Sequence, residues 1–254
     1  MPQIAAAGHM LEYQWVGSSG PTLVFLHEGL GSIRQWRDFP AQVAAATGCR
    51  ALVYDRYGYG NSDVLREPRV GAEFMHDGAL NELPELLEAL NIEAPILVGH
   101  SDGASIALIY AGTYKVPGVA VMAPHVFIED VCVDSIAKAN ADFETTDLPK
   151  RLGKYHRDAR KTFHLWADAW LDPAFRQWNI EEYLPRIHCP VLAIQGEDDE
   201  YGTMAQLDAI ARQVKGSCEL LKLPACGHSP HKDQPEKVLN SLANFIGKTV
   251  GTNP

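Results

Sequence analysis

The amino-acid sequence predicts an α/β fold: a mostly parallel sheet of about eight strands, with helices on both faces and a helical cap inserted into it. Apolar runs of about four to six residues alternate with segments of helical periodicity, which is typical of a parallel sheet covered on both sides. Between about residues 126 and 186 this alternation stops. The length of 254 residues fits one such domain carrying an insertion.

The predicted strands are short apolar runs. The runs that predict buried strands are residues 22–26, 51–55, 95–99, 118–122 and 191–195. Residues 218–223 are less uniformly apolar, and the alternating run at 11–15 predicts an edge strand. The stretches that predict amphipathic helices are residues 39–46, 80–90, 105–111, 204–214 and 238–246. Pro84 lies in the second stretch, so we expect that helix to start or kink there.

The segment between the two halves of the sheet is rich in Trp and charged residues and has no strong strand candidate. It predicts a helical cap over one edge of the sheet, where lids on such folds form. The expected division is a first core part at 1–124, a cap at 125–187 and a second core part at 188–254. The alternative is that these helices are long crossover connections of the main fold.

Composition excludes several classes of function. A net charge of −10 argues against a nucleic-acid binder and against binding to an anionic membrane. The five cysteines form no CxxC pair and are odd in number, which favours free thiols in a reducing compartment. We find no secretory signal and no apolar run long enough to span a membrane, so the sequence predicts a cytoplasmic protein. It contains no HExxH, no zinc-spaced Cys/His pair and no phosphate-binding glycine loop, and we expect neither a metal nor a cofactor.

The stretch VGHSDG places Ser101 between Gly99 and Gly103, after a predicted strand and before a predicted helix. In that setting a serine lies on a sharp turn that projects its hydroxyl at the carboxyl end of the strand. Side chains at the two glycine positions would collide with the neighbouring backbone. The simpler alternative is a serine that only caps the helix. Residues 60–64 come close to the same spacing but lack this context and predict a turn.

A serine hydroxyl needs an adjacent base, and the base needs an orienting carboxylate. Two later loops supply these groups, each directly after a predicted strand. The first is GEDDE at 196–200, with Glu197, Asp198 and Asp199 as candidate acids. The second is CGHSPH at 226–231, with His228 and His231 as candidate bases. The chain order of serine, acid and histidine is that of nucleophile-elbow enzymes.

With these motifs, the sequence resembles the α/β-hydrolase family over nearly its whole length. The motifs that carry the resemblance are LHEG at 26–29, DRYGYGNSD at 55–63, the serine turn and the two later loops. The resemblance implies that Asp199 is the acid and His228 the base. It also implies an oxyanion hole formed by the main-chain N–H groups of Gly29 and Asp102. The family usually has His-Gly where this chain has His27-Glu28, which adds a carboxylate near the pocket mouth.

We therefore expect a serine hydrolase of the carboxylesterase type, acting through an acyl-enzyme on a small ester. Carbon–carbon, lactone, amide or thioester cleavage by the same triad remain alternatives, as does a ligand-binding receptor on this fold. The residues expected to line a substrate pocket are Glu28, Leu30, His125, Trp166 and Trp178. By similarity to α-amino-acid ester hydrolases, the Asp102 side chain could also meet a substrate ammonium group. The only partner expected is a small molecule, with a homodimer possible.

Overall fold

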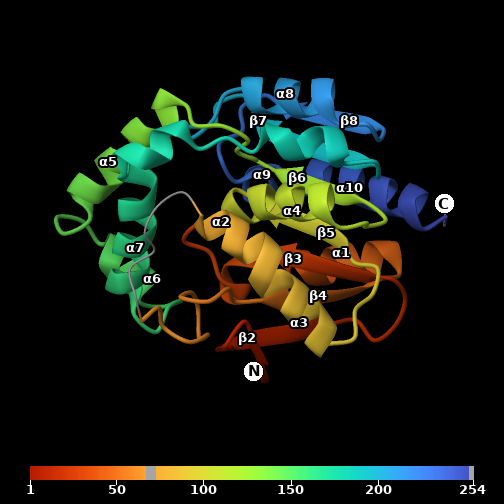
Figure 1. Ribbon diagram of the computed structural model, residues 1–254, viewed down its shortest axis with the longest axis horizontal. Helices are drawn as coiled ribbons and strands as arrows, with labels where there is room; N and C mark the ends of the chain where they lie inside the picture. Colours follow the sequence, from red (N-terminus) through yellow and green to blue (C-terminus); the bar gives the residue numbers. More distant parts are fainter. Residues whose placement is uncertain (67–72, 252–254) are drawn as a thin grey trace.

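A computed structural model of the chain describes residues 1–66 and 73–251. Its centre is an eight-stranded sheet with the strand order β1-β2-β4-β3-β5-β6-β7-β8 (Figure 1). The pairs β1–β2 and β2–β4 are antiparallel, and all later pairs are parallel. The predicted α/β class and mostly parallel sheet are confirmed. The strands are β1 (Gln3–Ala6), β2 (His9–Val16), β3 (Thr22–Leu26), β4 (Arg50–Tyr54), β5 (Ile96–His100), β6 (Val119–Met122), β7 (Val191–Gly196) and β8 (Cys218–Leu223).

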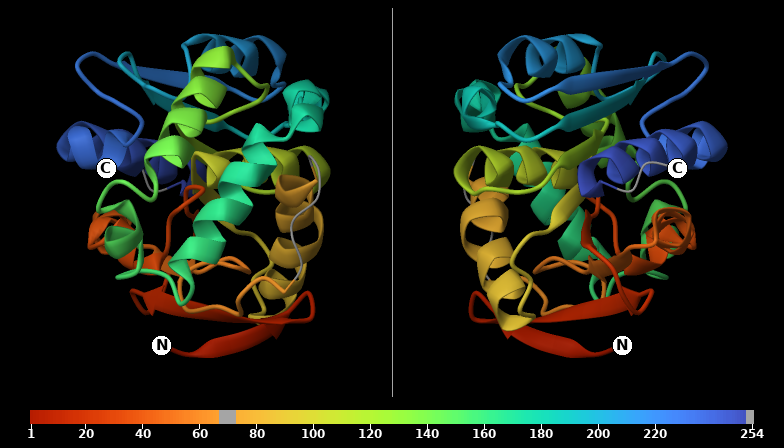
Figure 2. Two further views of the ribbon diagram at one scale, coloured as in Figure 1. Left: turned by 90° about the vertical axis from the view of Figure 1, so that its left-hand side faces the viewer. Right: turned by 90° about the vertical axis from the view of Figure 1, so that its right-hand side faces the viewer.

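Helices cover both faces of the sheet because its central strands are apolar on both sides. In β3, Val24 and Leu26 pack into one core cluster, whereas Leu23 and Phe25 pack into the other. The helices on the Val24 side are α2 (Phe74–Asp77), the π-helical turn η2 (Gly78–Glu82), α3 (Leu83–Ala89), α4 (Asp102–Thr113) and α8 (Ala205–Gln213). Those on the Phe25 side are the turn η1 (Ile33–Trp36), α1 (Phe39–Thr47), α9 (Pro230–Asp233) and α10 (Pro235–Val250). Figure 2 shows α2 and α3 on the opposite side of the sheet from α1 and α10.

One strand prediction was wrong in its position. The alternating run at 11–15 belongs to β2, but β2 is not the last strand of the sheet, because β1 pairs with its first half, His9 to Glu12. The prediction missed β1, whose four residues QIAA are too short and mixed to show a period. The predicted helix at 80–90 is η2 followed by α3, and Pro84 lies in the first turn of α3, as expected from its missing N–H.

Residues 125–187, here called the cap, are helical and contain no β-strand. Their only β-type pairing is an isolated bridge between Phe127 and Asn179. Figure 1 shows the cap helices α5 and α7 beside the sheet, at the edge where its strands end. The last turn of the cap packs against α4 in the main body. Nothing in the structure tests the boundaries at 124 and 187, which stay a prediction. The cap elements are α5 (Asp130–Asp142), α6 (Leu148–Leu152), α7 (Ala159–Leu171), η3 (Pro173–Gln177) and η4 (Glu181–Arg186).

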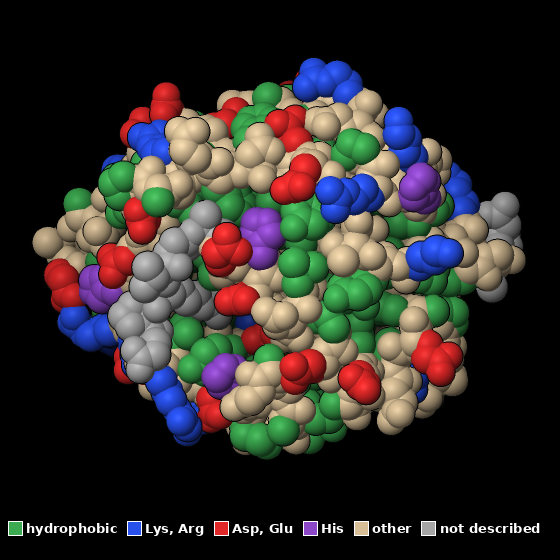
Figure 3. All heavy atoms as spheres, viewed as in Figure 1, with side chains coloured by type: hydrophobic (Ala, Val, Ile, Leu, Met, Phe, Trp, Pro, Cys, Tyr) green, Lys and Arg blue, Asp and Glu red, His purple; other side chains and the backbone are tan. Residues whose placement is uncertain are grey.

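The surface carries charges of both signs, interspersed with apolar side chains over the face seen in Figure 3. All five cysteines are free thiols, and three of them are buried. Within the described residues, no helix has the length and apolar character needed to cross a membrane.

Candidate active site

Ser101 lies on a strained turn between β5 and α4. Its backbone angles, φ 53° and ψ −120°, lie in a region that residues with a side chain rarely adopt. The flanking glycines make this turn possible. A Cβ at Gly99 would collide with the carbonyl oxygen of Gly103, and one at Gly103 would collide with that of Leu26. The turn therefore requires glycine at both positions, as the sequence predicted.

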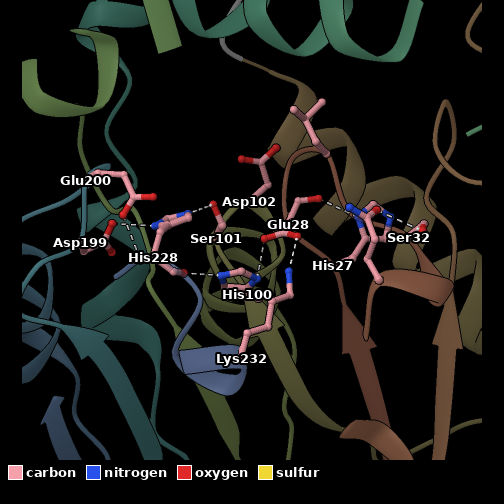
Figure 4. Close-up of polar contacts among 12 residues, drawn as sticks. His27, Glu28, Ser32, His100, Ser101, Asp102, Asp199, Glu200, His228 and Lys232 are labelled. Atoms are coloured by element: carbon pink, nitrogen blue, oxygen red, sulfur yellow. Dashed lines mark hydrogen bonds and ion pairs between the residues drawn. The ribbon is translucent and has the colours of Figure 1, made fainter. Parts of the chain in front are cut away.

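Three polar side chains from distant loops meet at this turn (Figure 4). The Ser101 hydroxyl lies 2.9 Å from Nε2 of His228, and Nδ1 of His228 lies 2.8 Å from Oδ1 of Asp199. Because the carboxylate can only accept, Nδ1 carries the proton and Nε2 is left to accept from the hydroxyl. Ser101 follows β5, Asp199 follows β7 and His228 follows β8, so the three groups share the carboxyl edge of the sheet.

The surroundings of Asp199 fix its orientation and charge. Oδ1 also accepts from the N–H of Tyr201 at 2.9 Å, and Oδ2 accepts from the Gln195 amide at 3.2 Å. Burial raises the pKa of Asp199, but the hydrogen bond and charge of His228 outweigh this and bring the pKa below its ordinary value. For His228, burial lowers the pKa, and the bond and charge of Asp199 outweigh that effect and raise it. The pair therefore favours an ionised carboxylate beside an unusually basic imidazole.

The alternative acids and bases lie elsewhere. The Asp198 N–H donates to the Cys226 carbonyl, and its side chain is exposed, as is that of Glu197. His231 packs between the rings of Trp36 and Phe39, at centroid distances of 4.9 and 5.3 Å. Of these candidates, only Asp199 and His228 form the chain of hydrogen bonds to Ser101.

Ser101 opens into a cavity of about 190 Å³ between the sheet edge and the cap. Among the predicted pocket residues, Glu28, Leu30, His125 and Trp166 line this cavity. Trp178 does not. It stacks on Phe175 at 5.5 Å inside the aromatic core of the cap. The other lining residues are Cys132, Ile136, Trp170, Glu200, Tyr201, Ser229 and Lys232.

Two signals in the sequence could have found some of these residues. Glu200 ends the acid loop and Tyr201 follows it, and Ser229 and Lys232 come one and four residues after His228. The N–H of His228 donates to the Glu200 carboxylate at 3.2 Å, which joins the acid and histidine loops a second time. Cys132 and Ile136 of α5 carried no comparable signal, because their orientation depends on how the cap sits on the sheet.

His125 follows β6 and lies behind His228, with the two ring centroids 5.8 Å apart. Burial and the neighbouring charge of His228 lower its pKa to about 3. Its imidazole is therefore neutral at physiological pH and presents one donor and one acceptor. Its ring also packs on Trp170 at 5.1 Å. A neutral polar group at the cavity wall suits hydrogen bonding to a substrate better than proton transfer.

Gly29 and Asp102 line the same cavity as Ser101, one on the loop after β3 and the other at the start of α4. A Cβ added at Gly29 would lie 3.0 Å from the Asp102 carboxylate and in collision with the indole nitrogen of Trp166. The two segments are thus in close contact beside the serine.

Glu28, where the chain departs from the family pattern, links three parts of the site (Figure 4). Its carboxylate lies 3.1 Å from Nδ1 of His100 and 3.1 Å from Nζ of Lys232. Nε2 of His100 donates to the His228 carbonyl at 2.7 Å. Burial raises the pKa of Glu28, but His100 and Lys232 outweigh it and hold the pKa well below its usual range. The added carboxylate thus joins the early loop, the serine turn and the histidine loop.

Within residues 1–66 and 73–251, no group of three or more His, Cys, Asp or Glu side chains could hold a metal ion.

Comparison with known proteins decides the family. A model described as the alpha/beta hydrolase family matches residues 23–241. The chain belongs to the alpha/beta hydrolase family. This alpha/beta hydrolase is 29% identical over 246 residues to serine hydrolase BPHL of Homo sapiens, a match that covers 90% of this chain and 80% of that protein. It is 23% identical to a proline iminopeptidase of Saccharolobus solfataricus, over 94% of this chain and 88% of that one.

A second group of relatives matches only part of this alpha/beta hydrolase. Protein phosphatase methylesterase 1 of Bos taurus is 29% identical over 123 residues, which are 47% of this chain and 31% of the methylesterase. The chain thus spans about a third of the length of the methylesterases that it matches. Among solved structures, the enol-lactonase of Burkholderia xenovorans superposes with a TM-score of 0.75 at 20% identity, covering 96% of this chain and 99% of that one. At that identity the likeness shows the fold alone.

Proposed function

We propose that this chain is a serine hydrolase that cleaves a small carboxylic ester through an acyl-enzyme. The observation that carries the proposal is the continuous hydrogen-bonded chain from Ser101 through His228 to Asp199, with distances of 2.9 and 2.8 Å. Binding alone needs no such arrangement, because an activated hydroxyl has a use only when a covalent bond forms. Serine hydrolase BPHL, the relative matched over most of the chain, carries a name that agrees with this class.

In the proposed reaction, Ser101 Oγ attacks the ester carbonyl carbon while its proton passes to Nε2 of His228. Nδ1 of His228 stays bonded to Asp199, which stabilises the imidazolium that forms. The tetrahedral intermediate then collapses as His228 returns the proton to the leaving alcohol and the carbon–oxygen bond breaks. Water attacks the acyl-serine with the same histidine as base, the bond between the acyl carbon and Ser101 Oγ breaks to release the carboxylic acid, and the histidine returns the proton to Oγ.

The negative charge of the tetrahedral oxygen needs main-chain donors on the side of the serine facing the cavity. Gly29 and Asp102 are the proposed donors. Asp102 is the first residue of α4, so the positive end of that helix also faces the developing charge.

The cavity favours a small substrate. Its volume of about 190 Å³ lies below the ~300–1,000 Å³ typical of pockets for drug-sized ligands. Ile136, Trp166 and Trp170 give it an apolar side, whereas Glu200 and His125 are polar. The idea that Asp102 binds a substrate ammonium gains little support, because the Arg56 guanidinium lies 3.8 Å from that carboxylate and already balances its charge.

The test is the replacement Ser101→Ala, with p-nitrophenyl acetate and its longer homologues as substrates. We expect kcat to fall by about 10⁶, toward the residual rate that binding and the oxyanion hole sustain, with the fold unchanged by circular dichroism. The matched control is Ser62→Ala, which removes the hydroxyl of the similarly spaced sequence at 60–64. That hydroxyl bonds the main chain of Glu12 and Asp55, and none of these three residues lines the cavity, so turnover per folded molecule should persist. Unchanged turnover in Ser101→Ala would eliminate the proposal.

The same assay separates the remaining chemistries. Matched ester, thioester, amide and lactone substrates, together with a vinylogous diketone for carbon–carbon cleavage, rank the bond types by kcat/KM. The proposal predicts that the ester ranks first. Tight equilibrium binding of a ligand with negligible turnover of every substrate would instead favour a receptor.

A further inference from the structure

Arg56 is a buried arginine that has no role in the proposed reaction as described so far. It lies in the turn after β4, within the sequence DRYGYG, and its side chain is only 2% exposed. It is not among the residues that line the cavity. A buried guanidinium is costly unless its charge and donors are matched, so its partners indicate what it is for.

The Arg56 guanidinium lies over the Tyr59 ring and donates its hydrogen bonds to main-chain carbonyls of the loop that contains Gly29. Its Nη2 donates to the Glu28 carbonyl at 2.9 Å and to the His27 carbonyl at 3.3 Å. Its main-chain N–H donates to Nε2 of His27 at 3.1 Å. Nδ1 of His27 in turn donates to the Glu28 carbonyl at 2.7 Å, and the Gly31 N–H reaches that carbonyl at 3.0 Å. Three donors therefore hold one carbonyl oxygen.

The protonation state of His27 agrees with this arrangement. Burial and the charge of Arg56 lower its pKa well below the ordinary value, so the ring is neutral. A neutral ring with its proton on Nδ1 has a lone pair on Nε2 for the Arg56 N–H. In this state, both nitrogens of the His27 ring form a hydrogen bond.

The direction of the Glu28 carbonyl fixes that of the next N–H. The described residues contain no cis peptide bond, so the Glu28–Gly29 peptide is trans. In a trans peptide the C=O and the N–H that follows it point in opposite directions. Because the carbonyl points at Arg56 and His27, which lie outside the cavity lining, the Gly29 N–H points the other way, toward the side on which Gly29 borders the cavity.

The same guanidinium also contacts the other side of the proposed oxyanion hole. Its Nη2 lies 3.8 Å from Oδ2 of Asp102, a carboxylate that is 1% exposed. The Asp102 carboxylate offsets the charge of Arg56, and its main chain begins α4 directly after Ser101. One buried side chain thus reaches both loops that would supply the two donors.

We propose that Arg56 is a positioning residue of the oxyanion hole: it holds the Glu28 carbonyl from behind, and so aims the Gly29 N–H at the developing oxyanion. It touches no reacting atom. This inference rests on the proposed function, since it assigns a role within the same reaction.

The test compares Arg56→Met with Arg50→Met. Arg50 is a second arginine that bonds a side chain, Thr22, and stacks on Trp15 away from the cavity, so it controls for the loss of a packed guanidinium. In Arg56→Met we expect kcat to fall at least tenfold, up to the ~10²–10³ that loss of one oxyanion donor costs, with KM within about threefold of the parent value. Arg50→Met should keep the parent kcat.

The decisive readout is binding of a transition-state analogue. A trifluoromethyl ketone adds to the serine and places an oxyanion in the hole, so its Ki should rise in proportion to the fall in kcat/KM. The acid limb of the pH–rate profile should not move, because Asp199 and His228 are untouched. Should Arg56→Met not fold, Arg56→Gln, whose amide is too short to reach the Glu28 carbonyl, carries the same expectations.

A folded Arg56 variant with parent kcat and parent Ki would overturn the inference. The inference would also be overturned by a loss of activity in which the Ki stays constant or the acid limb of the pH–rate profile shifts, since that pattern indicates damage to the triad. Failure of the underlying function is distinguishable: it appears as an active Ser101→Ala. An inactive Ser101→Ala with an unimpaired Arg56→Met overturns the role of Arg56 alone.

Discussion

The Asp199 carboxylate makes His228 more basic than an ordinary histidine, and this has a consequence for pH dependence. In the proposed reaction, His228 can accept the serine proton only when its imidazole is neutral. Because its pKa is raised from 6.5, kcat/KM should fall as the pH drops through a midpoint above 6.5. In Asp199→Asn the raising carboxylate is lost, so the midpoint should move down, with kcat lower by up to ~10⁴. A pH–rate profile of both proteins measures this. The neighbouring Asp198→Asn is the control and should match the parent profile; an equal effect there would contradict the assignment of Asp199.

Some residues of the candidate site could be predicted from the sequence, and others could not. Ser101 was identifiable because its glycines and flanking elements all point to the same turn. Among the three candidate acids of the GEDDE loop, only the family spacing selected Asp199, and the contact with His228 depends on the fold of both loops. The partners of Glu28 could not be predicted from the sequence, because Lys232 lies 204 positions away along the chain. Trp178 was placed in the pocket wrongly, since an aromatic residue of the cap fits its core and its cavity wall equally well in sequence.

Among the secondary-structure elements, the join of β5 and α4 tolerates the least change. A side chain at Gly103 would collide with the carbonyl oxygens of Leu26 and His27, which are main chain and cannot move aside. We expect Gly103→Ala to lower the free energy of unfolding by about 1–3 kcal/mol or more, measured by urea titration, and to reduce kcat by displacing Ser101. Gly153→Ala, where the nearest atom lies 3.3 Å away in helical backbone, should cost within about 0.5 kcal/mol. Equal stability of the two variants would contradict the close approach.

The positions of most strands were predictable from the sequence, but which strands lie next to each other in the sheet was not. Apart from β8, the parallel strands are apolar on both faces and stand out as runs, and the ends of all of them fall within about a residue of the prediction. The residues of β2 alternate between apolar and polar, but this pattern cannot say whether another strand pairs with its outer side. β1 does so, and its four residues carry too little pattern to be recognised.

For the molecule as a whole, the cap closes the cavity over the sheet edge, and Trp166 of α7 stands against the loop at Gly29. We expect Trp166→Ala to enlarge the cavity and shift the ester preference toward longer acyl chains, measured as kcat/KM across a chain-length series. Trp178→Ala is the matched control, because it removes a cap tryptophan that packs away from the cavity. It should cost ~3–5 kcal/mol of stability and leave the chain-length preference unchanged. The same shift in both variants would show that the cap acts on specificity only through its stability.

The class of the fold was predictable from the alternation of strands and helices, and the cap from its interruption. The order of the strands in the sheet and the way the cap rests on it were not, because both depend on contacts between segments far apart in the chain. Of the cap residues that line the cavity, Trp166 was named from the sequence, whereas Cys132 and Ile136 could be known only from the folded molecule.

The most direct measurement is the mapping of a fluorophosphonate adduct by peptide mass spectrometry. An activated serine at the carboxyl edge of the sheet should react stoichiometrically, and the mass increase should fall on the peptide containing Ser101. His228→Ala should abolish the labelling, because the hydroxyl then lacks its base. Labelling at another residue, or undiminished labelling without the imidazole of His228, would contradict an acyl-transfer site built on Ser101, His228 and Asp199.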